Sequence, residues 1–425
     1  MSRRLTRDEA WRLTGALLLV AALALRSPAL ALFGAGLLVA ALCVTLWGRF
    51  ALHGVAYRRR LGERRASFGE ELPFEVQIDN RKPLPLPWLE AEDSLPAGLE
   101  LAGRPLVLDR ASGRSTLRQV VSLRWYERVR LTYRLRCRAR GAFTLGPVRL
   151  ATGDPFGFVA REARLAQYES LLVYPKVLPL TALGLPAQHP FGERADRRRL
   201  FDDPSRLAGV RPYQSSDSPR HIHWKASARL QSLQTRVYEP TTRHTLMLYV
   251  NLASFEGYWW ASLNRDLLEL AIVAAASVAS WGLAQGYQVG LSTNGAAGGG
   301  AGSGAGRRPG EELGVAPAGD PQQRVRLLEA LARISQFART PLPAMLSRDR
   351  TRLPWGTTVV VVSAVFPEDV LRALLALRGA GHLPVALRIG GPPVTPLAGL
   401  VAFRLPEDLP WVDLPELPVG ALQAA

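Results

Sequence analysis

Hydrophobic residues fall into three different patterns along this chain, and each pattern predicts a different kind of element. Near the start, residues 13–25 are apolar except for Thr14, and residues 29–47 contain no charged side chain. Between residues 68 and 165, apolar and polar positions alternate, which is typical of half-buried β-strands. From residue 246 onward, β-branched runs alternate with alanine- and leucine-rich helical segments. These patterns predict three structurally distinct regions.

The first two apolar segments predict a transmembrane helical hairpin within residues 1–67, with spans at about 11–26 and 29–47. The second segment would rise about 28 Å as a helix, close to the roughly 30 Å hydrocarbon core. Trp11 and Trp47 would act as interfacial anchors. Arginines flank the hairpin at Arg3, Arg4, Arg7, Arg12, Arg49, Arg58, Arg59, Arg60, Arg64 and Arg65, whereas the turn has only Arg26. By the positive-inside rule, we expect a multi-pass protein of the cell (inner) membrane with both termini in the cytoplasm.

Two other interpretations of these apolar segments remain. A signal peptide, of the twin-arginine kind given Arg3 and Arg4, would send the remainder of the chain outside. A buried helical hairpin in a soluble protein would also use apolar helices.

Residues 68–165 predict a small antiparallel β-sandwich. In the run 129–137, Val, Leu, Tyr, Leu and Cys share one face, while Arg130, Thr132, Arg134 and Arg136 share the other. Residues 74–78 alternate in the same way, and turn signals recur between the runs. The arginine face is either a solvated strand surface or a patch for anionic lipid or nucleic acid. We expect no nucleic acid, because no aromatic residue interleaves with these arginines to stack bases.

Residues 246–425 predict an open α/β sheet with helices on both faces. The expected strands are 246–252, 287–292, 357–363 and 384–389, and the expected helices are 264–285, 320–339 and 367–378. A glycine-rich insertion spans residues 295–319. It contains no lysine, so it does not match a phosphate-binding loop.

Charge separates these regions further. The chain carries 53 basic and 36 acidic residues, a net charge of +17. Residues 1–67 hold 11 basic and 3 acidic residues, whereas residues 246–425 hold 14 of each. The excess therefore belongs to the membrane flanks, the sandwich and the connecting segment, and the α/β region is neutral. Two cysteines, Cys43 and Cys137, exclude a disulfide framework.

The densest group of polar residues lies in the connecting segment 166–245, between residues 209 and 239. Lys225 is notable there, because the chain has only three lysines and an ammonium suits a site that needs a compact cation. The candidate binding residues are Arg211, Tyr213, Asp217, Arg220, His223, Trp224, Lys225 and Arg229.

Three interpretations fit this segment. It is a structural latch, an acid–base or nucleophilic site that uses Asp217, His223 and Lys225, or a metal site at His221 and His223. The metal interpretation lacks a nearby carboxylate or cysteine ligand.

This segment resembles the signature of the domain-of-unknown-function 58 family, approximately R-x-Y-x-x-G-D-x-x-R-x-I-H-W-K-x-x-A-R, with Ser216 in place of the usual glycine. Further similarity covers the membrane hairpin, a β domain ending in residues 141–147 and 154–157, and a von Willebrand factor A-like α/β domain. The resemblance implies a membrane-anchored partner of MoxR-type AAA+ ATPases that assists the assembly or maturation of other proteins, including envelope components.

A von Willebrand A-like domain often holds Mg²⁺ in an Asp-x-Ser-x-Ser loop after its first strand. Here that loop contains Asn251, Ala253, Ser254 and Phe255. The loss of the carboxylate and of two hydroxyls removes the oxygen ligands that Mg²⁺ prefers. We therefore expect no bound metal and no other cofactor.

Together these observations predict a cytoplasm-facing, membrane-tethered adaptor without catalytic activity, which contacts the lipid bilayer and whose α/β domain docks a partner protein, a MoxR-type AAA+ ATPase. The alternatives are an enzyme built on Asp217, His223 and Lys225, or a lipid- or envelope-binding module that uses the basic strand of the sandwich. No Ser/His/Asp or Cys/His constellation is recognisable in the sequence.

Overall fold

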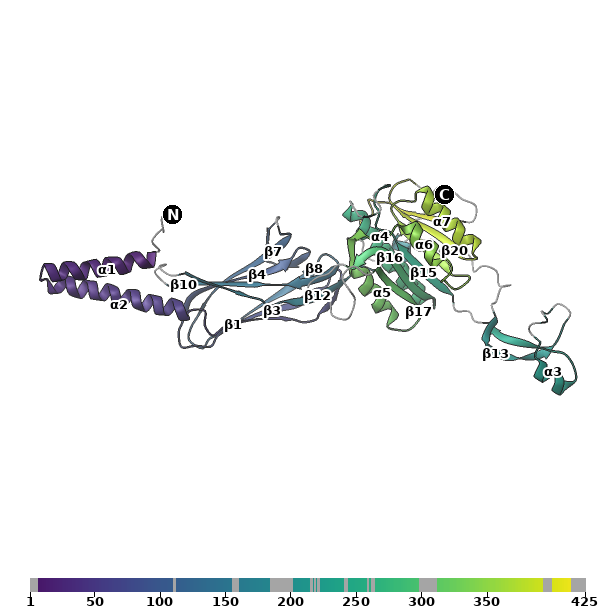
Figure 1. Ribbon diagram of the computed structural model, residues 1–425, viewed down its shortest axis with the longest axis horizontal. Helices are drawn as coiled ribbons and strands as arrows, with labels where there is room; N and C mark the ends of the chain where they lie inside the picture. Colours follow the sequence, from purple (N-terminus) through teal and green to yellow (C-terminus); the bar gives the residue numbers. More distant parts are fainter. Residues whose placement is uncertain are drawn as a thin grey trace. The chain divides into compact units, whose positions relative to one another are not determined.

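The structure is a computed structural model with two compact units, one containing Met1–Lys176 and the other beginning at Val177 (Figure 1). It describes residues 7–109, 112–154, 160–183, 202–214, 217, 219, 222–240, 244–257, 260, 264–297, 312–392 and 400–413.

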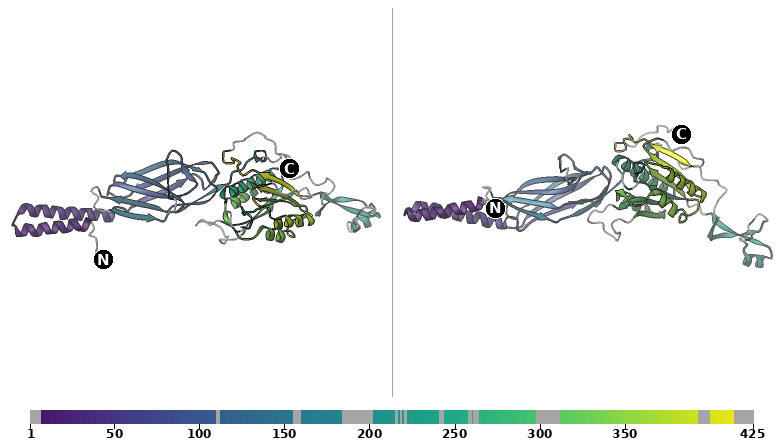
Figure 2. Two further views of the ribbon diagram at one scale, coloured as in Figure 1. Left: turned by 90° about the horizontal axis from the view of Figure 1, so that it is seen from above. Right: turned by 45° about the horizontal axis from the view of Figure 1, so that its top comes forward.

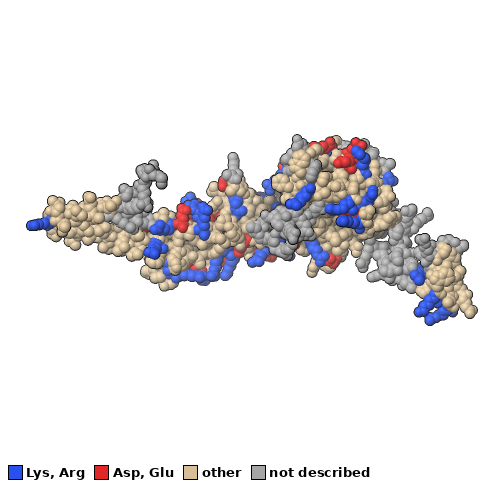
Figure 3. All heavy atoms as spheres, viewed as in Figure 1, with Lys and Arg blue, Asp and Glu red and all other residues tan. Residues whose placement is uncertain are grey.

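The chain begins with two apolar helices, α1 (Arg7–Ala24) and α2 (Pro28–Phe50), which lie side by side (Figure 2). Pro28 occupies the first turn of α2, where its missing N–H costs nothing. The helices approach closely at Gly34 because this residue has no side chain. A Cβ there would lie only 3.2 Å from the Leu19 nitrogen. The outer surface of this pair is apolar, and Figure 3 shows uncharged atoms along most of its visible face.

Within the described part of the chain, two helices are long and apolar enough to cross a membrane, but their burial differs. The apolar window of α2 is 11% buried, whereas that of α4 (Arg265–Ala284) is 72% buried inside the second unit. A residue run that is apolar all round and buried is typical of a core helix. The helices therefore support membrane association at the N-terminal hairpin, and the number of spans and their orientation stay predictions.

The β domain of the first unit begins at Val55, earlier than the predicted boundary at residue 68. Its strands are β1 (Val55–Leu61), β2 (Arg65–Ser67), β3 (Glu71–Asn80), β4 (Leu86–Pro96), β5 (Leu99–Leu101), β6 (Val107–Asp109), β7 (Arg114–Leu123), β8 (Arg128–Cys137), β9 (Gly141–Leu145), β10 (Val148–Gly153), β11 (Ala160–Leu165) and β12 (Glu169–Tyr174).

These strands form a four-stranded sheet in the order β1-β3-β8-β5, a five-stranded sheet in the order β11-β10-β4-β7-β6, and a smaller sheet β2-β12-β9. The basic segment 58–65, expected as a membrane flank, contributes most of β1 and reaches into β2.

One hydrophobic core joins these sheets. Phe74, Val76 and Ile78 project from β3 into this core, where they pack with Leu135 of β8 and Leu89 of β4. Each such side chain stabilises the fold by about 1.5–3 kcal/mol through removal of apolar surface from water. The predicted alternation of residues 129–137 is confirmed in β8, whose burial alternates along the strand.

The arginines on the outer face of β8 pair with acidic residues of the neighbouring strand β3. Arg128 lies 2.8 Å from Asp79, and Arg130 and Arg134 each lie 3.9 Å from a carboxylate, of Glu75 and Glu71 respectively. All three arginine side chains are more than half exposed, so each pair adds little to stability. This pairing favours the interpretation of the row as a solvated strand face.

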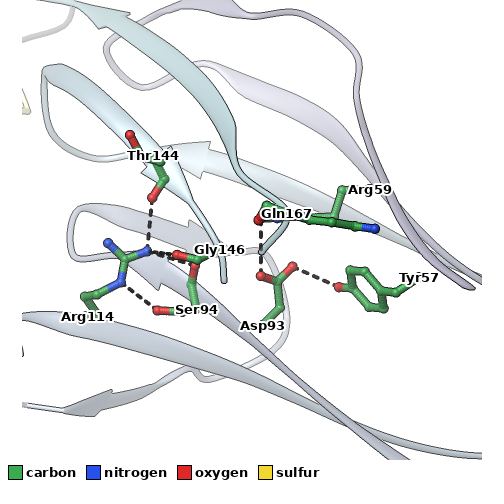
Figure 4. Close-up of polar contacts among 8 residues, drawn as sticks. All are labelled: Tyr57, Arg59, Asp93, Ser94, Arg114, Thr144, Gly146 and Gln167. Carbon is green, nitrogen blue, oxygen red and sulfur yellow. Dashed lines mark hydrogen bonds and ion pairs between the residues drawn. The ribbon is translucent and has the colours of Figure 1, made fainter. Parts of the chain in front are cut away.

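A buried ionic cluster crosses from β1 to β4 inside the sandwich (Figure 4). The Tyr57 hydroxyl donates to Asp93 Oδ2 at 2.8 Å, and Arg59 lies 3.3 Å from Asp93 Oδ1. Arg59 also donates to the Gln167 carbonyl. Burial raises the pKa of the Asp93 carboxyl to about 6, although the charge of Arg59 and the hydrogen bond from Tyr57 act in the opposite direction.

A second arginine holds the turn between β9 and β10. Arg114 on β7 donates from Nε to Ser94 Oγ at 2.6 Å and from NH2 to the carbonyls of Thr144 and Gly146 at 3.0 and 2.7 Å (Figure 4). Gly146 has a φ of +98°, and a Cβ there would collide with the Gln167 carbonyl. These contacts give residues 141–147 of the family pattern a structural role. Of the related segment 154–157, residues 155–157 lie outside the described residues.

Replacement of Asp93 with asparagine should change how stability depends on pH. An aspartate in an unfolded chain titrates near pH 3.9, so a folded pKa of about 6 gives a contribution that is largest below pH 4 and is lost as the pH rises through 6. The D93N variant lacks this titration. We expect the stability difference between the native chain and D93N to shrink by about 2.4 kcal/mol from pH 4 to pH 7.5.

The measurement is the urea midpoint of the sandwich in the full chain, read from pulse-labelled amides of β1 and β4. D109N, at an exposed position of β6, is the control and should show a much smaller change. A D93N difference that stays constant with pH would contradict the raised pKa.

The second unit contains the predicted open α/β sheet. Its elements are a 3₁₀ turn (Leu180–Leu183), β13 (Asp202–Pro212), α3 (Trp224–Leu230), β14 (Gln234–Pro240), β15 (Thr245–Val250), α4, β16 (Gln288–Ala297), β17 (Glu312–Ala318), α5 (Gln323–Ala332), β18 (Ile334–Ala338), α6 (Leu342–Asp349), β19 (Thr358–Ser363), α7 (Glu368–Gly379), β20 (Leu383–Ile389) and β21 (Val401–Leu405). The main sheet has the order β17-β16-β15-β19-β20-β21, with β17 antiparallel.

Helices cover both faces of this sheet (Figure 1). Met247 and Tyr249 of β15 pack with residues of α6 and α7 on one face, whereas Leu246 lies near Gly282 of α4 on the other. The β-branched run in β19 is buried at all six positions, as expected for the centre of a parallel sheet.

Three predicted elements differ from the structure. The helix expected over residues 320–339 ends at Ala332, and Ile334–Ala338 form β18, which pairs with β16. The expected glycine-rich insertion at 295–319 is shorter, because its two ends belong to β16 and β17. Residues 298–311 lie outside the described residues. Helix α6 was not anticipated; Pro343 lies in its first turn, and Pro341 precedes it as the N-cap residue.

Candidate functional site

The signature residues lie on a small antiparallel hairpin formed by β13 and β14, and the connection between these strands contains α3 (Figure 1). Arg211 pairs with Thr235, and Pro212 pairs with Gln234 across the hairpin. Arg220, Ser216 and His221 lie outside the described residues. We call residues 209–236 the signature hairpin.

Asp217 holds the turn that follows β13. Its Oδ1 lies 2.6 Å from Arg211, and its Oδ2 accepts a hydrogen bond from the Gln214 backbone at 2.9 Å. The Tyr213 hydroxyl donates to the Asp217 carbonyl at 3.0 Å. Arg211, Tyr213 and Asp217 therefore bind one another within six residues of chain.

His223 begins helix α3 and joins it to β14. Its Nδ1 accepts from the Ala226 backbone at 3.1 Å, which caps one of the free amides of the first turn. The backbone N–H of His223 donates to the Gln234 carbonyl at 2.8 Å. Ser227 is buried and extends this junction, because its hydroxyl donates to the His223 carbonyl and accepts from the Gln234 amide.

Three further candidate residues, among those that the structure describes, face solvent. Trp224 is 68% exposed, and Lys225 and Arg229 are exposed one turn apart on the same side of α3. Leu230 and Leu233 add exposed apolar surface beside them. Figure 3 shows basic but no acidic side chains on the visible face of the body that carries α3. The segment therefore divides into an inner group that shapes the hairpin and an outer group of one indole and two cations.

These positions give Asp217, His223 and Lys225 separate tasks. Asp217 accepts from Arg211 and the Gln214 backbone, His223 caps α3, and Lys225 projects from the helix. The contacts of Asp217 and His223 lie within the signature hairpin and shape it, whereas a latch that ties this segment to the sheet stays a prediction. Sequence reasoning missed Ser227 and Gln234, which have no distinctive pattern and are recognisable only from their contacts.

Replacement of Asp217 with alanine should loosen the signature hairpin, because Arg211 and the Gln214 amide lose a charged acceptor. Such hydrogen bonds contribute about 2 kcal/mol, which corresponds to roughly 30-fold faster amide exchange. The measurement is hydrogen exchange of peptides covering residues 209–236. W224A is the control, since its exposed indole should leave protection unchanged. Equal protection in D217A and the native chain would argue against this role of Asp217.

A second polar group lies at the carboxyl edge of the α/β sheet. Asn251 follows β15, and its side chain donates to Ser363 Oγ of β19 at 2.9 Å and accepts from Asn294 of β16 at 2.7 Å. Asn294 Oδ1 in turn accepts from the Leu252 backbone at 3.0 Å. Asn251, Asn294 and Ser363 are all buried. We call these three residues the amide network.

The amide network lies where strand order diverges between β15 and β19, the point at which open α/β sheets often bind ligands. Its polar atoms are neutral and bond to one another. Of the other residues in the predicted loop, Ala253 and Ser254 are buried, and Phe255 is about half exposed. Among the described residues there is no group of three or more His, Cys, Asp or Glu side chains that could hold a metal ion.

We expect titration of the full chain with Mg²⁺ or Mn²⁺ to give no submillimolar binding, because a divalent cation would have to break the amide network and would gain no carboxylate. N251D should not restore binding, because Ala253 and Phe255 still supply no side-chain oxygen. The measurement is isothermal titration of both proteins after treatment with a chelator. Submillimolar binding that disappears in N251A would overturn this expectation.

Comparison with known proteins agrees with the resemblance noted in the sequence. Residues 209–414 match the family described as "Protein of unknown function DUF58". The match covers the signature hairpin and the α/β sheet. The chain is also 25% identical to the uncharacterized protein YeaD of Bacillus subtilis (strain 168) over 350 residues, which cover 80% of this chain and 77% of that protein.

Solved structures resemble only part of the chain. The CARDB domain of a Pyrococcus furiosus protein, in complex with di-metal ions, is 12% identical, covers 28% of this chain and 91% of its own, and has a TM-score of 0.19. The full-length major pilin SpaD of Corynebacterium diphtheriae is 10% identical, covers 27% and 35%, and has a TM-score of 0.20. Neither likeness is close enough to bear on function.

Proposed function

We propose that this protein is a membrane-tethered adaptor without catalytic activity, and that the outer face of its signature hairpin docks a protein partner. The resemblance to the DUF58 family points to a MoxR-type AAA+ ATPase as that partner. The adaptor would serve the maturation of other proteins or envelope components.

The observation that carries this proposal is the division of the signature residues. Arg211, Tyr213, Asp217 and His223 make the contacts that shape the hairpin. Trp224, Lys225 and Arg229 lie outside these contacts and are exposed. An exposed tryptophan in a family signature has no evident structural purpose, and tryptophan and arginine are the residues that most often anchor protein interfaces.

The charge of this face restricts the partner. Lys225 and Arg229 lie one turn apart, and Arg236 on β14 is exposed as well. A complementary partner surface would present an apolar pocket for the indole with carboxylates beside it, because opposite charges speed association and fix the orientation of the complex. A MoxR-type ATPase that docks here should therefore have an acidic patch.

The α/β sheet is open and has helices on both faces, and this architecture supports the proposal of a von Willebrand factor A-like domain. The neutral amide network supports a domain that binds its partner without a metal. We propose that this domain holds no cofactor and that docking is concentrated on the signature hairpin.

The apolar surface of α2 supports tethering to a membrane. Arginines flank both ends of the hairpin, so we propose a multi-pass protein of the inner membrane with both termini in the cytoplasm. In this orientation the signature hairpin would lie in the cytoplasm, where it is accessible to cytoplasmic partners.

The enzyme alternative makes a different claim about Lys225. If Lys225 served as a catalytic acid, base or nucleophile, K225A would abolish a turnover while leaving the hairpin folded. In the structure, Asp217 and His223 accept hydrogen bonds from the hairpin's own backbone. Because these two side chains serve the hairpin and not a shared reaction centre with Lys225, the adaptor is the better-supported proposal.

The docking proposal predicts that K225E/R229E loses binding to the MoxR-type ATPase by at least about 100-fold, since the new glutamates would face the acidic patch and like charges at an interface cost several kcal/mol. W224A should weaken binding by about 30-fold or more. The measurement is biolayer interferometry between the full chain in nanodiscs and the purified ATPase.

R265E/R324E is the matched control, because it makes the same charge change at two exposed positions of the α/β sheet unit. It should bind like the native chain. The docking proposal fails if K225E/R229E and W224A both bind normally, or if R265E/R324E loses as much affinity as K225E/R229E.

A further inference from the structure

The C-terminal end of α2 is joined to the sandwich by a buried lysine. Lys82 is 9% exposed, and its ammonium donates to the carbonyls of Ala51 and His53, the latter at 2.8 Å. Both carbonyls lie just beyond the last turn of α2, and a cation at this place opposes the negative end of the helix dipole. The indole of Trp47 also donates to the Pro85 carbonyl at 3.3 Å. The loop 82–87 is therefore attached directly to the end of α2.

A pocket of about 800 Å³ opens at this junction. It lies between the last turns of α2 and the loop 82–87, and its apolar lining includes Val44, Leu46, Trp47, Phe50, Leu84 and Pro87. Leu46 and Phe50 are about half exposed, so the apolar surface of α2 continues into the pocket. His53, Lys82 and the buried Asp154 are its polar members.

The turn between β7 and β8 lies against the same loop. Asn80 donates to the carbonyls of Leu84 and Arg124 at 3.0 and 2.7 Å, and the Tyr126 amide donates to the Lys82 carbonyl at 3.2 Å. This turn presents Trp125 and Tyr126, which are 68% and 69% exposed. Two large aromatic side chains thus face solvent at the end of the sandwich nearest α2.

These features match the surroundings of a lipid. Tryptophan and tyrosine favour the level of the headgroups, where an apolar ring and a polar tip are both satisfied. Pockets of 300–1,000 Å³ with an apolar lining and a few polar groups accept small organic ligands. Arg49, Arg81 and Arg124 are exposed near this end, and such cations attract anionic lipids.

We propose that this pocket binds an acyl chain of an anionic phospholipid from the membrane that α2 enters, with Trp125 and Tyr126 at headgroup level. This inference rests on the membrane-tethering part of the proposed function and is independent of the docking part. In this arrangement the sandwich binds a lipid next to α2, the helix that anchors the sandwich to the membrane.

The test uses the full chain in nanodiscs that contain phosphatidylglycerol with a diazirine on its acyl chain, followed by photolysis and peptide mapping. We expect label on α2 and on the loop 83–87. Label at exposed Val107 of β6 gives the background, because this apolar residue lies by the opposite end of β7. L84W, which narrows the pocket, should reduce loop label while leaving label on residues 29–42 of α2.

The outcomes separate the two claims. Label on α2 without label on the loop overturns the lipid pocket and leaves tethering intact, whereas an unlabelled α2 overturns tethering itself. Loop label that L84W does not reduce, in a variant with native protection of β4 amides, also overturns the pocket. The same probe on phosphatidylcholine should label the loop less, and equal labelling overturns the preference for anionic lipid.

Discussion

A polar atom that is removed from water must find a partner inside the protein, and this requirement shapes each region of the molecule. In the sandwich, Asp93 is buried with Arg59 and Tyr57. Arg114 donates hydrogen bonds to three backbone carbonyls around the β9–β10 turn. In the α/β sheet, Asn251, Asn294 and Ser363 bond to one another. Solvent-facing side chains are free of this requirement, so they are the ones available for partners.

The basic residues divide along the same line. Arginines of β8 pair with carboxylates of β3 across an exposed surface, and Arg59 and Arg114 serve the interior. Two of the three lysines have opposite environments, because Lys82 is buried against the end of α2 and Lys225 is exposed on α3. A net charge of +17 therefore describes several local tasks and no single basic surface.

Periodicity predicted the elements whose burial is simple. The alternating run of β8, the β-branched run of β19 and the apolar helix α2 each have one dominant pattern over at least six residues. The pattern failed where neighbours decided the conformation. Residues 334–338 continue a helical pattern and form β18, because pairing with β16 satisfies their backbone. Strand β1 is rich in arginine, and its place became clear only from its pairing with β3.

The candidate site follows the same division. The sequence by itself determined that residues 209–239 concentrate polar chemistry, that Lys225 is unusual, and that the loop at Asn251 lacks the ligands of a metal site. Only the tertiary structure decided that Asp217 and His223 face inward while Trp224, Lys225 and Arg229 face solvent, and that Trp125, Tyr126 and the loop 82–87 meet at the end of α2. The physical reason is that composition and spacing record which groups are present, whereas burial and hydrogen-bond partners depend on strands and turns distant in the chain.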